Sequence, residues 1–231
     1  MNLGCSLGHD VTAVMPFKEK NAKYKIVLSD PEQTLLTKMA EATEPVMTGE
    51  DTNPLNLIKT MMNTTYNLND NALSDSEIQK LIKDPSTRFD LVIVQPLFSS
   101  EAGYYLAHRF KAPIAIWNTA QSHMPFISTA MGQPYNPSYV QLPLLGAIGH
   151  MTFFERVINT FASFIFEHVA RNTVMIRNTN LLLDKHFPGE PRPDLLQLEK
   201  NVSVAFSFGH PLILDGLAPT VPNYVQLGKL S

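Results

Sequence analysis

A strand, a helix and a second strand follow one another between residues 90 and 118, and this run limits the fold more than any other part of the sequence. Residues 90–95 (DLVIVQ) form a short apolar run of the kind that is covered on both faces in a parallel sheet, and Pro96 ends it. A helix is predicted over residues 100–110, and residues 114–118 form the next apolar run. Together the three segments predict an α/β fold with parallel strands.

Further strands are predicted at residues 11–14, 25–28, 202–206 and 224–227, between segments of helical character. Residues 74–77 (SDSE) have the spacing of a capping box and predict a helix in which Ile78, Leu81 and Ile82 fall on one face. The expected architecture is a Rossmann-like, doubly wound parallel sheet that forms one domain over residues 1–231. Residues 1–8 are too few to supply the strand and helix that open such a domain, so both are expected to be missing.

The balance of charge and the metal-binding residue types exclude several classes of partner. Lys and Arg number 18 against 21 Asp and Glu, a formal net charge of −3, so no nucleic-acid partner is expected. The seven histidines are scattered, which predicts no metal site. Charged residues make up 17% of the chain, below the ~25% typical of soluble domains, which indicates a surface that faces a partner or a membrane. The single cysteine, Cys5, excludes an internal disulfide.

Residues 150–171 are unusual, because apolar side chains surround almost the whole circumference of the predicted helix. A helix of that kind must be covered. Two interpretations stay open: the helix packs at the centre of the core, or it contacts a lipid surface or another subunit. No run of about 20 apolar residues predicts a membrane-spanning helix, and the first ten residues lack the apolar run of a signal peptide.

Five segments, in order along the chain, together resemble the N-terminal domain of UDP-glycosyltransferases of the insect or animal type. They are residues 7–12 (LGHDVT), 89–93 (FDLVI), 136–140 (NPSYV), 151–159 (MTFFERVIN) and 222–228 (PNYVQLG). The third and fourth are specific, whereas the first two occur in many α/β proteins. The resemblance extends over essentially the whole chain and over about half of a typical family member.

The resemblance implies the fold and the reaction. Family members combine two Rossmann-like domains in the GT-B arrangement, in which the N-terminal domain binds the acceptor and the C-terminal domain binds the UDP-sugar. Residues 1–231 are then expected to be a partial acceptor-binding domain without the donor-binding domain. The parent protein is expected to transfer a hexosyl group, with inversion, from a UDP-sugar co-substrate to a small lipophilic hydroxyl acceptor, as in detoxification, without a cofactor. The alternative is a non-catalytic acceptor-binding or regulatory partner protein.

The resemblance also implies a location and partners. Typical animal members enter the endoplasmic reticulum by a signal peptide and are held by a C-terminal membrane helix, and neither is seen in this chain. Glycosylation sequons at residues 63–65 and 201–203 fit the lumen. We therefore expect the lumen or membrane of the endoplasmic reticulum, homo- or hetero-oligomers with related glycosyltransferases, and peripheral membrane contact through residues 151–170.

No catalytic residue of the family is expected in this chain. In the family a histidine after the first strand removes the acceptor proton, and that position would lie before residue 1. His9 belongs to the turn before the second strand and is no substitute. By the resemblance, the aspartate that orients the base ends the strand at residues 90–95, where this sequence has Gln95. An amide cannot stabilise an imidazolium ion by charge, so the chain alone is expected to be inactive.

The acceptor pocket is expected beyond the carboxyl ends of the strands, because ligands of open α/β sheets bind there. The loops that meet this condition lie at residues 15–17, 95–98 and 118–123, with Phe126 close behind the third. The acceptor-binding residues predicted from them are Phe17, Gln95, Phe98, Thr119, His123 and Phe126. Apolar walls with few polar groups suit lipophilic hydroxyl compounds. For the three phenylalanines, ordinary packing against neighbouring helices stays an open alternative.

Overall fold

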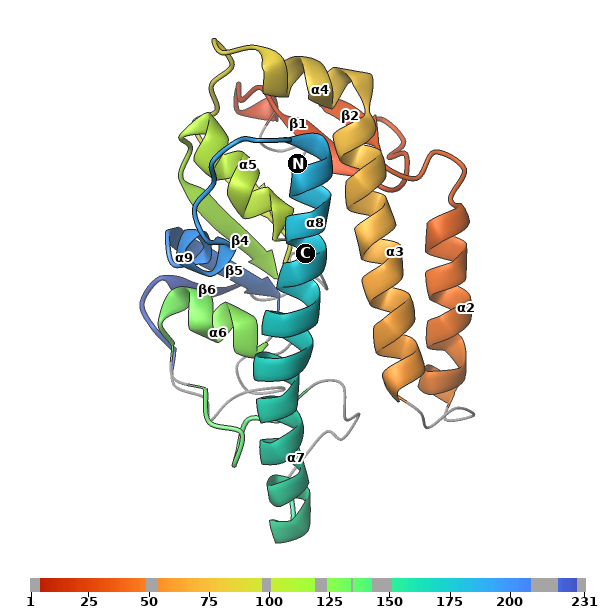
Figure 1. The fold of residues 1–231 in the computed structure, drawn as a ribbon, viewed down its shortest axis with the longest axis vertical. Coiled ribbons are helices and arrows are strands. Elements are labelled where there is room, and N and C mark those ends of the chain that lie inside the picture. Colours follow the sequence, from red (N-terminus) through yellow and green to blue (C-terminus); the bar gives the residue numbers. More distant parts are fainter. Residues whose placement is uncertain are drawn as a thin grey trace. The chain divides into compact units, whose positions relative to one another are not determined.

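The computed structural model describes residues 5–48, 54–96, 101–118, 124–133, 135–142, 151–208 and 220–227 (Figure 1). They divide into two compact units, each with its own parallel sheet. The first unit takes the described residues up to Thr87 together with Asp184–His186, and the second takes the rest. Parallel strands joined by helices confirm the predicted α/β class.

The first unit pairs two parallel strands and adds three helices. Its elements are β1 (Thr12–Met15), β2 (Lys25–Leu28), α2 (Thr34–Thr48), α3 (Pro54–Ser74) and α4 (Ser76–Lys83). The carboxylate of Asp30 accepts the N–H groups of Leu35 and Leu36 at 2.9 Å each, which satisfies two donors in the first turn of α2. The two strands lie where the sequence predicts them, to within one residue.

The start of α4 differs from the predicted capping box. Its N-cap is Asp75, whose carboxylate accepts the N–H of Glu77 at 2.8 Å and that of Ile78 at 3.3 Å. Ser74 instead ends α3. An aspartate caps a helix as well as a serine does, so the sequence alone left the two candidates equivalent. The predicted apolar face is confirmed in Ile78 and Ile82, which are buried.

The second unit is built on a four-stranded parallel sheet in the order β3-β4-β5-β6. Its strands are β3 (Val92–Val94), β4 (Ile114–Asn118), β5 (Val202–Phe208) and β6 (Tyr224–Leu227). Its helices are α5 (Ala102–Phe110), α6 (Pro125–Met131), α7 (Phe153–Ile165), a π-helix (Phe166–Met175), α8 (Ile176–His186) and α9 (Leu195–Glu199). Figure 1 shows α7, the π-helix and α8 as one continuous rod. The predicted strands are all present.

The core of the second unit is centred on β4. Ile114, Ala115 and Ile116 are nearly inaccessible, as expected for a strand covered on both faces. The same expectation is wrong for β3, because Ile93 is 57% exposed. The reason is the position of β3 at the edge of this four-stranded sheet. Helix α5 approaches β3 closely at Gly103, where a Cβ atom would lie 2.9 Å from both methyl groups of Val94.

The last residues of α8 belong to the first unit and are bound there by Asp70. The Nζ atom of Lys185 contacts the two carboxylate oxygens of Asp70 at 2.7 and 2.8 Å, and Nε2 of His186 lies 2.7 Å from Oδ1. Burial raises the pKa of Asp70, but the hydrogen bonds from these two side chains outweigh it and lower the pKa below the ordinary value. The ion pair therefore stabilises the folded unit, and this contribution is lost as the pH falls through that lowered pKa.

The interpretation of residues 150–171 as a core helix is wrong for α7. Its large apolar side chains are more than half exposed at six positions: Phe153, Phe154, Ile158, Phe161, Phe164 and Ile165. The side chains that α7 buries are instead polar, namely Asn159 and Ser163. Among the described helices, none is both long and apolar enough to cross a membrane.

Candidate functional site

Three polar residues, which we call the polar row, lie at the carboxyl ends of three neighbouring strands of the second unit. Gln95 follows β3, Asn118 ends β4, and Ser207 lies near the end of β5. Asn118 and Ser207 are partners in the strand register, and Nδ2 of Asn118 donates to Oγ of Ser207 at 3.2 Å. Because the strands are parallel, the three residues lie at one edge of the sheet, which is where ligands of such sheets bind, and Asn118 and Ser207 share a register position there.

This row offers hydrogen bonds but no charge. Gln95 is exposed, whereas Asn118 and Ser207 are each 3% exposed. Amide and hydroxyl groups donate to and accept from a neutral polar ligand, but none of the three titrates near neutral pH. Gln95, the exposed member of the row, can therefore form a hydrogen bond with a hydroxyl compound, and the row supplies no general base for removing its proton.

Phe126, predicted as an acceptor contact, lies in α6 and is 9% exposed. The guanidinium carbon of Arg171 lies 5.8 Å from the centre of its ring, within the range of a cation–π contact. The ring is thus held on one side by a buried cation. Whether its remaining edge meets a ligand stays a prediction.

The other predicted site residues are distributed differently. Phe17 follows β1 in the first unit and is 44% exposed. Phe98, Thr119 and His123 lie outside the described residues. Gln95 is at the end of β3, the place that the family resemblance gives to the orienting aspartate. The ligand contacts of these residues remain predictions.

A cluster of buried charged side chains lies within the second unit, and the sequence did not predict it. Arg171 of the π-helix is 2% exposed and binds two carboxylates, that of Glu199 in a short ion pair and that of Glu167 at 3.2 Å. Glu101, the residue before α5, is 8% exposed and accepts the hydroxyl of Thr179 at 3.2 Å. One cation, Arg171, is therefore close to three carboxyl groups, those of Glu101, Glu167 and Glu199. We call these four residues the Arg171 cluster.

Burial changes the protonation of these carboxyl groups. Burial raises the pKa of Glu199 to about 7, although the charge of Arg171 acts in the opposite direction. Burial also raises the pKa of Glu101. Glu101 is the residue before α5, and Arg171 contacts the ring of Phe126 in α6, so the cluster joins these two helices.

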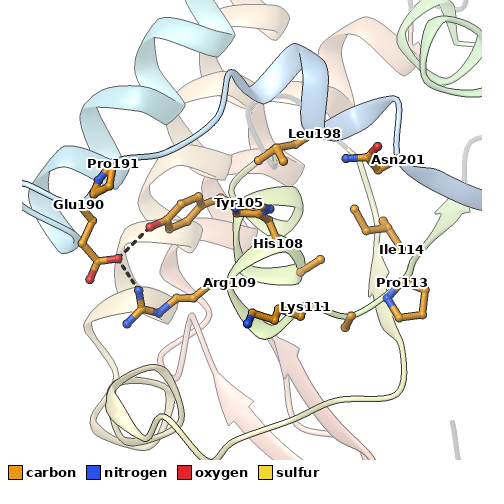
Figure 2. Close-up of a pocket in the computed structure, with 12 residues that line it drawn as sticks. Tyr105, His108, Arg109, Lys111, Pro113, Ile114, Glu190, Pro191, Leu198 and Asn201 are labelled. Atoms are coloured by element: carbon orange, nitrogen blue, oxygen red, sulfur yellow. Dashed lines mark hydrogen bonds and ion pairs between the residues drawn. The ribbon is translucent and has the colours of Figure 1, made fainter.

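A depression of about 570 Å³ lies at the opposite edge of the same sheet (Figure 2). Ile114 at the start of β4 and Asn201 before β5 line it, as do Arg109 of α5 and Lys111 after that helix. Figure 2 shows Glu190 accepting the hydroxyl of Tyr105, at 3.0 Å, and pairing with Arg109. The candidate site is nevertheless the polar row, because parallel sheets bind ligands at their carboxyl ends.

In the described part of the chain, no group of three or more His, Cys, Asp or Glu side chains could hold a metal ion. The amide and hydroxyl groups of the polar row offer hydrogen bonds to a ligand. Of the residues in this row, the sequence indicated Gln95 and Asn118 through their place after apolar runs. It missed Ser207, because the predicted strand ended at residue 206.

Comparison with known proteins agrees with the resemblance noted in the sequence. Residues 6–182 match the family described as UDP-glucoronosyl and UDP-glucosyl transferase. UDP-glucosyltransferase 2 of Dactylopius coccus is 28% identical over 228 residues, which cover 96% of this chain and 42% of that protein. UDP-glycosyltransferase UGT4 of the same organism is 27% identical over 162 residues, or 68% of this chain and 31% of that protein. The chain thus spans less than half the length of these relatives. No solved structure matches it.

Proposed function

This chain belongs to the UDP-glycosyltransferase family, and we propose that it forms the acceptor-binding part of an enzyme that transfers a hexosyl group from a UDP-sugar to a small lipophilic hydroxyl compound. The observation that carries the proposal is the row of Gln95, Asn118 and Ser207 at the carboxyl edge of the sheet. Uncharged donors and acceptors suit a neutral hydroxyl group, and Phe126 of the same unit is proposed to supply an apolar contact.

The transfer reaction needs groups that this row lacks. A base must take the proton of the acceptor hydroxyl while UDP leaves from the opposite face of the sugar. Gln95 cannot accept a proton near neutral pH, and it cannot stabilise a protonated base by charge. Since the chain spans less than half of its relatives, we propose that the base and the UDP-sugar site lie outside these 231 residues. The part described here would then position the acceptor.

A binding measurement tests this division of roles. The chain is expected to bind a lipophilic phenol such as 1-naphthol weakly, with a Kd of about 10 µM or above, and to bind no UDP. The variant Gln95→Ala should weaken phenol binding, because it removes an exposed hydrogen-bonding group from the row. Gln197→Ala, an equally conservative change at an exposed glutamine of α9, should leave it unchanged. Isothermal titration calorimetry measures the affinity of the chain for the phenol and for UDP, and the affinity of each variant for the phenol. UDP binding in the micromolar range would refute the proposed assignment of roles.

A second candidate function is a non-catalytic binding protein that retains the acceptor pocket. The observation that favours it is Gln95, because an uncharged amide stands where the family resemblance implies an aspartate. The two functions differ in what the complete protein does with a UDP-sugar. Phenol binding without transfer by the complete protein would favour the binding protein.

We also propose that the protein resides in the lumen of the endoplasmic reticulum, and the sequon at Asn201 provides the test. Asn201 lies in the turn between α9 and β5, and both its side chain and that of Ser203 are exposed. In microsomes, a chain carrying a cleavable leader is expected to gain an endoglycosidase-sensitive glycan that Asn201→Gln removes. Asn67→Gln, at an exposed asparagine outside any sequon, should not change the gel mobility. A protease-protected chain without this glycan would count against the luminal assignment.

A further inference from the structure

The depression at the amino edge of the second unit's sheet has a glycosylation sequon at its border. The sequon consists of Asn201, Val202 and Ser203. Val202 is the first residue of β5 and pairs in register with Ile114 of β4, so Asn201 stands at the edge where the depression lies. Val202 is buried, whereas the side chains of Asn201 and Ser203 are exposed. A sugar attached to Asn201 therefore begins at the depression.

The depression has the size of a small-molecule site and a lining that changes along it. Its volume of about 570 Å³ falls within the ~300–1,000 Å³ of such sites. Figure 2 shows Asn201 at one end and Glu190 at the other. Beside Asn201 the lining is apolar and consists of Leu198, Ile114 and Pro113. Toward Glu190 it becomes polar.

The polar end offers hydrogen-bonding groups that the fold does not use. The Oε2 atom of Glu190 accepts from both Tyr105 and Arg109, and within the described part of the chain nothing binds Oε1. The side chains of His108 and Lys111 are exposed, and neither forms a hydrogen bond or an ion pair with the residues that the structure describes. A carboxylate oxygen and an ammonium group can accept from and donate to the many hydroxyl groups of a sugar.

We infer that the N-linked glycan of Asn201 folds back on the chain and that its first two sugars, both N-acetylglucosamine, occupy this depression. The inference rests on the proposed location in the lumen, where such glycans are attached. Attachment joins the anomeric carbon of the first sugar to Nδ2 of Asn201. The bond between that carbon and the pyrophosphate of a lipid-linked oligosaccharide breaks, and one amide proton leaves with the pyrophosphate.

The order of the two sugars matches the order of the lining. The first N-acetylglucosamine has an apolar ring face and an acetyl methyl group, which suit Leu198 and Pro113 beside the attachment point. The hydroxyl groups of the second sugar then meet Glu190 and Lys111. Weak contacts are sufficient, because covalent attachment holds the sugars at an effective concentration of the order of millimolar. A free sugar in so open a depression lacks this advantage.

Hydrogen exchange of the glycosylated chain tests this contact. The chain is produced with a cleavable leader and with Asn63→Gln, so that Asn201 is the remaining sequon asparagine. Backbone amides of residues 108–114 and 195–201 are expected to exchange at least about fivefold more slowly with the glycan than in the Asn201→Gln variant. Mass spectrometry measures both the exchange and the occupancy of Asn201.

A glycan placed elsewhere is the matched control. In the Asn201→Gln chain, Lys23→Thr creates a sequon at Asn21, an exposed residue between β1 and β2. A glycan there should leave the exchange around the depression unchanged. Equal exchange with and without a glycan on Asn201 would overturn the inference and leave the luminal location intact. A luminal chain without a glycan on Asn201 would overturn both.

A variant of Lys111 tests the polar end of the depression. Lys111 ends α5 in the left-handed conformation, with a φ of 55°, so Lys111→Gly removes the ammonium group without straining the backbone. The glycan is expected to raise the Tm of the chain by about 2–4 °C, and to raise that of Lys111→Gly by less than half as much. Lys83→Ala, at an exposed lysine of α4, should keep the full increase. An increase that Lys111→Gly leaves unchanged would overturn the proposed placement of the sugars.

Discussion

Replacing Arg171 with methionine is expected to lower the free energy of unfolding by about 3–5 kcal/mol at pH 8, because it leaves the carboxyl groups of the Arg171 cluster buried without a cation. That loss is a large part of the stability of an ordinary domain, about 5–15 kcal/mol. Urea denaturation followed by circular dichroism measures it. Arg177→Met, at an exposed arginine of the same helical rod, should change the free energy by less than about 0.5 kcal/mol.

The loss of stability in Arg171→Met should be smaller at pH 5 than at pH 8. Burial raises the pKa of Glu199 to about 7, so the folded state favours its protonated form. For a carboxyl group whose pKa is raised, the stabilising contribution is complete below the ordinary value of 4.5 and is lost as the pH rises through about 7. At pH 5 the protonated Glu199 has little need of Arg171, and Arg171→Met should cost less than at pH 8. An equal loss at both pH values would show that Arg171 acts through packing alone.

An apolar replacement of both partners separates charge from volume. The double variant Arg171→Met with Glu199→Leu removes the cation and its closest carboxylate together. It should recover a substantial part of the stability that Arg171→Met loses, since a buried pair can often be exchanged for apolar side chains. A double variant less stable than Arg171→Met would contradict this view of the cluster.

The second large effect concerns the rate of sugar transfer and position 95. When the chain is fused to the upstream strand with its histidine and to a donor-binding domain of a relative, Gln95→Asp is expected to raise kcat at least about 100-fold. The reason is that a carboxylate beside the histidine orients the imidazole and stabilises its protonated form, whereas an amide does not. Release of UDP in the presence of 1-naphthol measures kcat.

Two controls test whether the charge at position 95 causes the increase in kcat. Gln95→Asn changes the length of the side chain as the aspartate does, but adds no charge, so it should not raise the rate. The unfused chain should show no transfer with either Gln95 or aspartate at this position, because catalytic groups that act as a unit return little rate when only one is restored. Equal rates for the Gln95 and Gln95→Asp fusions would show that residue 95 does not orient the base.

The sequence predicts the sheet well because its strands are marked locally. Strands β2 and β6 have the predicted bounds, since each is an apolar run between polar residues. Helices α2 and α3 have no comparably clear local sequence pattern. Pro45 interrupts the pattern of α2, and α3 is rich in Asn and Thr, which favour helices weakly. These two helices pack against each other, and that tertiary contact could not be inferred from local preference.

The candidate site was predictable only where it follows from strand order. Gln95 and Asn118 stand after apolar runs, so their edge of the sheet could be inferred. The pairing of Asn118 with Ser207 joins strands 89 residues apart in sequence and depends on a register that the sequence does not encode locally. The same is true of the Arg171 cluster. Arginine and glutamate on a helix are normally solvated, and only the packing of distant helices buries Arg171 against Glu199.

The π-helix between α7 and α8 determines how far α7 is rotated about the helix axis relative to α8. Its buried side chains at Phe166 and Arg171 are five residues apart, the spacing of a π-helical turn, whereas Thr179 and Leu183 of α8 return to a spacing of four. Deleting one residue there would let the rod become α-helical throughout and would turn α7 by about 100° relative to α8. Asn159 would then lose its hydrogen bonds to the carbonyl oxygens of Pro137 and Val140. The length of this segment is therefore fixed more strictly than its residue types, and relatives that share both faces of the rod must share its residue count.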